Sequence, residues 1–141
     1  MRVLALDVGE KRIGVALSDP TGIIATPNTT IQRSGEAADI EAVLSLAMEH
    51  GVKEIVVGLP LTLAGRVGTQ ARQVTRFAAA LADRASVPVK TLDERYSTVQ
   101  AERMMREAGG RPSRNKATVD AAAAAVILQG YLDAGRPTPS S

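Results

Sequence analysis

The chain has 141 residues, a length that fits one domain able to bury a core of its own. It has no cysteine and a single histidine, which excludes disulfides, cysteine nucleophiles and multi-histidine zinc sites. The formal net charge of +2 is weak support for a polyanionic partner. No apolar run approaches the ~20 residues of a membrane span, and the N-terminus does not resemble a signal peptide. We therefore expect a soluble cytoplasmic protein.

The N-terminal part of the chain predicts three antiparallel strands. Residues 3–6 form a buried apolar run that ends close to Gly9, which suits a turn. Residues 12–18 alternate in polarity and predict the second strand of a hairpin. Residues 23–31 contain Pro27 and indicate an irregular third strand near a sheet edge. Together these segments predict a meander.

The rest of the chain predicts alternating helices and strands. Strands are expected at residues 53–58 and 87–92, and helices at 36–49, 69–85, 97–105 and 119–132. This order predicts an α/β fold, with a five-stranded mixed sheet flanked by helices. We expect residues 1–134 to form a single domain. Residues 135–141 are rich in proline and serine and predict a disordered tail.

Three acidic residues stand at places where an α/β fold displays reactive groups. Asp7 ends the first strand, Glu94 follows the fifth, and Asp120 begins the last helix. Each also has a purely structural explanation. As structural residues, Asp7 would cap a turn, Glu94 would form an ion pair with Arg95, and Asp120 would interact favourably with the helix dipole. If the first strand is central, however, the three carboxylates converge at one sheet edge. Such a cluster is typical of a Mg²⁺ or Mn²⁺ site, in which two ions activate water and stabilise the leaving oxygen of a phosphodiester.

Basic residues near these acids are candidates for binding substrate phosphates. Lys11 and Arg12 follow Asp7, and Arg95 follows Glu94. A glycine-rich turn at residues 65–68 carries Arg66 and opens a helix, where backbone N–H groups can meet a phosphate. A basic segment further along holds Arg111, Arg114 and Lys116. An ordinary turn explains residues 65–68 equally well. A solvated helix end explains the segment with Arg111, Arg114 and Lys116 equally well.

Several motifs, in order along the chain, resemble the YqgF/RuvX family. They are DVGEKRIGVA at residues 7–16, VGLPL at 57–61, the turn at 65–68, DERYST at 93–98, KATVD at 116–120 and ILQGYL at 127–132. The resemblance runs from residue 1 to about residue 133. Because the motifs occur in the family's order, together they are far more specific than any one alone.

This resemblance implies an RNase H-like fold related to bacterial Holliday junction resolvases. It also implies a divalent-metal nuclease that processes the 5′ end of pre-16S rRNA, resolves Holliday junctions, or does both. Asp7, Glu94 and Asp120 fall on the positions that the family uses for metal. Whether Asp93, the neighbour of Glu94, shares this role stays open.

Two other functions remain open at this point. The turn at residues 7–9 also resembles the phosphate-binding hairpin of actin-like ATPases and phosphotransferases, although that class normally needs two such domains. Alternatively, the chain is a non-catalytic nucleic-acid-binding protein that kept the fold. Cutting a junction requires two active sites, so that activity predicts a homodimer, and the helix with Met104 and Met105 is a candidate surface for it.

Overall fold

The structure is a computed structural model of the chain, and it describes residues 1–59, 68–93 and 116–135. Its strands are β1 (Val3–Val8), β2 (Arg12–Ser18), β3 (Ala25–Gln32), β4 (Glu54–Leu59) and β5 (Val89–Asp93). Its helices are α1 (Glu36–Glu49), α2 (Thr69–Arg84) and α4 (Lys116–Gly135). The described residues contain no helix that is both long and apolar enough to cross a membrane.

The strands form one mixed sheet in the order β3-β2-β1-β4-β5. β1, β2 and β3 pair antiparallel, as the predicted meander requires, while β4 and β5 run parallel to β1. β1 is therefore central. Its apolar residues are buried on both faces, which explains why its sequence is a nearly continuous apolar run. The prediction of a five-stranded mixed sheet is confirmed.

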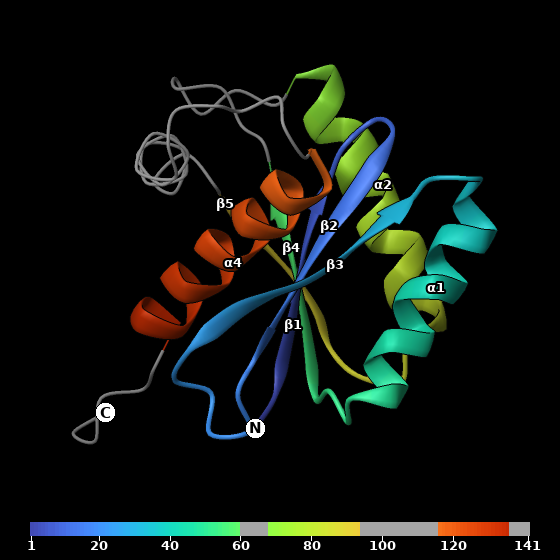
Figure 1. Cartoon of the computed structure of the whole chain (residues 1–141). Coiled ribbons are helices and arrows are strands. Elements are labelled where there is room, and N and C mark those ends of the chain that lie inside the picture. Colours follow the sequence, from blue (N-terminus) through green and yellow to red (C-terminus); the bar gives the residue numbers. More distant parts are fainter. Residues whose placement is uncertain (60–67, 94–115, 136–141) are drawn as a thin grey trace.

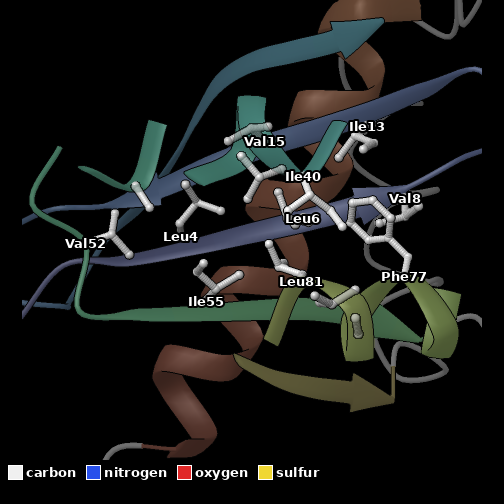
Figure 2. Packing of buried hydrophobic residues seen from close by; sticks show 14 of the residues in the cluster. Leu4, Leu6, Val8, Ile13, Val15, Ile40, Val52, Ile55, Phe77 and Leu81 are labelled. Carbon is white, nitrogen blue, oxygen red and sulfur yellow. The ribbon is translucent and has the colours of Figure 1, made fainter. Parts of the chain in front are cut away.

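Helices cover the two faces of the sheet as separate layers (Figure 1). α1 and α2 pack on one face, and α4 lies across β1, β2 and β3 on the other. Side chains alternate along β1, so that Leu4 and Leu6 point toward α1 and α2 while Val3 and Ala5 point toward α4. Figure 2 shows the first of these layers, with Phe77 of α2 at the same end of the cluster as Val8 and Ile13.

Some predicted boundaries need correction. α4 begins at Lys116 rather than at residue 119, so Thr118 lies inside the helix instead of capping it. β3 begins at Ala25 rather than at residue 23, because Asp19 accepts hydrogen bonds from the backbone of Ile23 and Ile24 and holds both in a turn. The predicted helix at 97–105, with Met104 and Met105, lies outside the described residues. So does the tail after Gly135.

Candidate active site

Asp7 lies near the carboxyl end of the central strand, on the face covered by α4. It pairs in register with Gly14 of β2, and its neighbours two residues back, Ala5 and Val3, belong to the layer beneath α4. The Asp7 residue is partly buried. Asp7 lies on this face because side chains along a strand alternate between the two faces of the sheet. Every second residue of β1 lies under α4, and residue 7 continues that series.

Asp120 reaches the same place because α4 approaches the sheet unusually closely. A Cβ atom on Gly14 would lie 2.0 Å from the backbone oxygen of Asp120, so only glycine leaves room for the helix here. Gly14 stands opposite Asp7 on the neighbouring strand. The absence of a side chain at residue 14 therefore brings the backbone of Asp120 down onto the part of the sheet that carries Asp7.

The two carboxylates interact electrostatically. Burial, and after it the negative charge of Asp120, together raise the pKa of Asp7 from 3.8 to about 6. Both causes act against the ionised form of Asp7. The site thus concentrates negative charge in a poorly solvated place, and a bound cation would relieve this cost.

Arg12, at the start of β2, partners Asp120. Its Nε donates a hydrogen bond to Oδ2 of Asp120 at 2.6 Å, and both side chains are about one quarter exposed. Among the described residues, no donor reaches Oδ1 of Asp120 or the carboxylate of Asp7. The structure thus gives Arg12 an ion pair with Asp120, and its predicted binding of substrate stays a prediction.

The other predicted site residues divide into two groups. Lys11 is exposed in the turn between β1 and β2, and Lys116 is the first residue of α4 rather than part of a loop. The residues that lie outside the described part of the chain are Arg66, Glu94, Arg95, Arg111 and Arg114. Asp93 is the last residue of β5 and pairs in register with Leu59.

Gly14 is the site residue that sequence reasoning missed. Its position inside an alternating strand was the available signal, because a glycine there often marks a place where another backbone comes close.

The described residues fit a divalent cation in donor type and charge. Asp7 and Asp120 supply carboxylate oxygens, the ligands that Mg²⁺ and Mn²⁺ prefer. Within residues 1–59, 68–93 and 116–135 there is no group of three or more potential metal ligands.

A protein family and several named relatives match this chain. Residues 1–134 match the family described as "RuvX: Holliday junction resolvase". A protein of Chloroflexus aurantiacus named "Putative pre-16S rRNA nuclease" is 49% identical over 98% of this chain and 90% of its own length. A protein of the same name from Mycobacterium leprae is 50% identical over 94% of this chain and 72% of its own length.

Solved structures support the fold. Thermus thermophilus RuvC matches with a TM-score of 0.60 at 16% identity, covering 96% of this chain and 97% of that one. The fowlpox virus Holliday junction resolvase matches with a TM-score of 0.58 at 10% identity, covering 95% and 99%. The architecture is thus the RNase H-like fold of the RuvC resolvases. Since the match to the family model spans residues 1–134 and the relatives are nearly half identical along almost the whole chain, this protein belongs to the RuvX family of Holliday junction resolvases.

Proposed function

We propose that this chain is a divalent-metal-dependent nuclease whose catalytic carboxylates are Asp7, Glu94 and Asp120. The observation that carries the proposal is the close approach of the Asp120 backbone to Gly14, the residue opposite Asp7, and the charge of Asp120 adds to burial in raising the pKa of Asp7. An ionised Asp7 in this partly buried place costs folding free energy, because burial and the negative charge of Asp120 both oppose its ionisation. Such an arrangement is explained by a cation that both acids hold.

The cofactor we propose is Mg²⁺ or Mn²⁺, held by Asp7 and Asp120. When bound, the ion would supply a Lewis acid that activates water and neutralises charge on the phosphate. We propose Glu94 as the third ligand in preference to Asp93. Glu94 follows β5 directly in the sequence, and the family resemblance implies that this position holds metal.

The chain's own residues would then position the ligands and the substrate. Arg12 holds Oδ2 of Asp120, which leaves Oδ1 available to the cation. The exposed Lys11 would contact the phosphate backbone next to the reacting phosphate. The further phosphate contacts that we propose are Arg12, Arg66, Arg95, Arg111, Arg114 and Lys116.

For the substrate we propose the precursor of 16S rRNA, processed at its 5′ end in the cytoplasm. The relatives that carry the rRNA name are nearly half identical to this chain. RuvC, whose structure in complex with a Holliday junction also matches, is only 19% identical, and that likeness concerns the fold alone. Junction resolution is the second candidate, favoured by the description of the family itself. It would require a homodimer, since two strands must be cut.

One assay tests the proposal. Purified protein is incubated with labelled 16S rRNA precursor, linear DNA and four-way DNA junctions, each with Mg²⁺, Mn²⁺ or EDTA. We expect metal-dependent cleavage of the rRNA precursor, and Asp7→Asn or Asp120→Asn should reduce it at least roughly 100-fold. Asp133→Asn is the matched control, because Asp133 is an exposed acid on the same helix that contacts only Gln129 among the described residues.

Each alternative has its own signature in this experiment. Junction cleavage by a dimeric species, with the rRNA precursor left intact, would establish resolution instead. Binding without cleavage, unchanged when all three acids are replaced, would support the non-catalytic alternative. ATP turnover would support the actin-like one. Cleavage that survives Asp7→Asn would overturn the proposed site.

A further inference from the structure

A second charged group lies behind the turn that follows Asp7. Arg33 comes directly after β3, and its guanidinium donates to the backbone oxygen of Gly9 at 2.9 Å and to Oδ2 of Asp39 at 3.1 Å. The same guanidinium lies over the ring of Phe77, 5.4 Å from the centroid. The backbone N–H of Arg33 also donates to the oxygen of Lys11 at 2.9 Å. Arg33 therefore contacts the turn between β1 and β2 at two separate carbonyls.

Asp39 anchors this arrangement from the first turn of α1. Its side chain is only 1% exposed, and its second oxygen accepts a hydrogen bond from the backbone N–H of Ser34 at 3.0 Å. Both carboxylate oxygens are thus occupied by donors of the segment that leads from β3 into α1. Phe77 belongs to the large apolar cluster and lies at its end near Val8 and Ile13, as Figure 2 shows. The guanidinium is thus held between Asp39 of α1 and the Phe77 ring of α2.

Stability alone does not explain why Arg33 and Asp39 form a buried ion pair. Removing a carboxylate from water costs several kcal/mol, and a well-packed apolar pair often serves equally well. What an apolar pair cannot supply is a directed donor to the oxygen of Gly9. That turn is already tight, because the N–H of Gly9 donates to the oxygen of Arg12 at 2.8 Å and a Cβ on Gly9 would lie 2.9 Å from that oxygen. Arg33 fixes the position of the turn, whereas the Gly9–Arg12 hydrogen bond fixes only its shape.

We propose that Arg33, held by Asp39 and Phe77, is a positioning residue that sets the place of the Gly9–Lys11 turn and so presents Lys11 to the substrate backbone. This inference rests on the proposed function, because it assumes that Lys11 contacts a phosphate. Arg33 acts through the turn and does not itself touch the reacting atoms. Arg12 is oriented separately, by its ion pair with Asp120.

The test uses Arg33→Lys, which keeps the charge but loses the planar fork that reaches two acceptors at once. We expect KM for the rRNA precursor to rise about 10-fold with kcat changed less than about 3-fold, since each 1.4 kcal/mol of binding is tenfold. Lys11→Ala should raise KM similarly. The double variant should be no worse than Lys11→Ala alone, because the two changes remove the same contact.

The matched control is Arg84→Lys. Arg84 of α2 pairs with Glu41 of α1 at 2.9 Å, but on the exposed surface. The Arg84→Lys variant should leave KM and kcat unchanged. Effects of Arg33→Lys and Lys11→Ala that multiply in the double variant would overturn the inference. So would a loss confined to kcat.

A second readout needs no catalysis. Amide hydrogen exchange should accelerate about 10-fold or more at the Gly9–Lys11 turn in Arg33→Lys, with exchange in α4 unchanged. Unchanged exchange in the turn would overturn the inference even if the wild type cleaves nothing. Accelerated exchange in Arg33→Lys, combined with a wild-type chain that neither binds nor cuts nucleic acid, would instead retain the positioning of the turn and reject the proposed function.

Discussion

The two faces of the central sheet are built from side chains of different size. The face toward α1 and α2 carries leucine, isoleucine and valine, with Phe77 packed against them. The face toward α4 carries mainly alanine and valine, and glycine at residue 14. Large side chains hold a helix away from a sheet, whereas small ones let its backbone approach. The fold thus concentrates apolar burial on one face and uses the other to bring Asp120 to Asp7.

The two faces of the sheet also differ in how much they contribute to stability. Burying a large aliphatic or aromatic side chain contributes about 1.5–3 kcal/mol, and an alanine contributes much less. The α1/α2 face should therefore dominate stability, and changes there should leave chemistry intact. Changes on the α4 face should alter the candidate site more than the stability. The following variants test this division.

Leu81→Ala should have the largest effect on stability. Leu81 of α2 is fully buried in the large cluster, so its truncation removes apolar burial and leaves a cavity. We expect the free energy of unfolding to fall by about 2–5 kcal/mol, measured in urea. Activity per folded molecule should be retained. Leu44→Ala, at a partly buried position of the same layer, is the control and should cost less. Equal losses would contradict the view that burial sets the cost.

Gly14→Ala tests the close approach on the other face. The new Cβ would meet the backbone oxygen of Asp120, so α4 must shift away from β2. We expect a stability loss of about 1–3 kcal/mol from overpacking and a far larger loss of cleavage, because Asp120 moves with its helix. Gly130→Ala is the control: among the described residues, no atom outside the backbone of α4 itself lies within 4 Å of its Cβ position. It should stabilise α4 by roughly 0.5–1 kcal/mol. Full activity in Gly14→Ala would contradict the role assigned to residue 14.

Asp7→Asn should stabilise the protein in EDTA while abolishing activity. The wild-type pKa of about 6, against 3.8 in an unperturbed carboxyl, means that the folded state opposes ionisation of Asp7. At about 1.36 kcal/mol per pH unit, the penalty is at most about 3 kcal/mol, and partial exposure reduces it. We therefore expect a gain of roughly 1–3 kcal/mol at pH 7.5, measured by denaturant unfolding.

The sign of the pH dependence follows from the same values. Below pH 3.8 the carboxyl is protonated in both states and costs nothing. As the pH rises toward 6, the unfolded state releases its proton first, so the wild type loses stability relative to Asp7→Asn. Above about pH 6 the difference should be constant. A difference that shrinks as the pH rises would contradict the assigned burial and repulsion.

Much of the fold was predictable because its signals are local. The range 36–49 of α1 agrees with the structure, since glycine stands at residues 35 and 51 on either side. The start of α4 was not predictable from Thr118, which is typical of a cap, because Lys116 and Ala117 are also good helix formers. Local pattern cannot separate these alternatives.

The candidate site was predictable only in part. Asp7 was visible as an acid near the end of an apolar strand. The ion pair of Arg12 with Asp120 was not, because it depends on how closely α4 approaches Gly14. Asp39 had the ordinary explanation of an acid in the first turn of a helix, and nothing near it in sequence indicates a contact with the β1–β2 turn.

Tyr131→Phe should have the smallest effect, and it examines the far end of α4. The Tyr131 hydroxyl donates to Oε1 of Glu54 at 2.6 Å, and Lys90 lies 2.9 Å from the other oxygen of that buried carboxylate. Because Lys90 still pairs with Oε2 of Glu54 and only Oε1 loses its donor, we expect a loss of about 1 kcal/mol in unfolding free energy. Lys90→Met removes the other partner of the same carboxylate, on its exposed side, and its loss of unfolding free energy is compared with that of Tyr131→Phe. Glu54 pairs in register with Val3, at the opposite end of β1 from Asp7, so cleavage should be unchanged. A loss of cleavage in Tyr131→Phe would mean that α4 positions Asp120 through contacts along its whole length, and that the close approach at Gly14 is not sufficient.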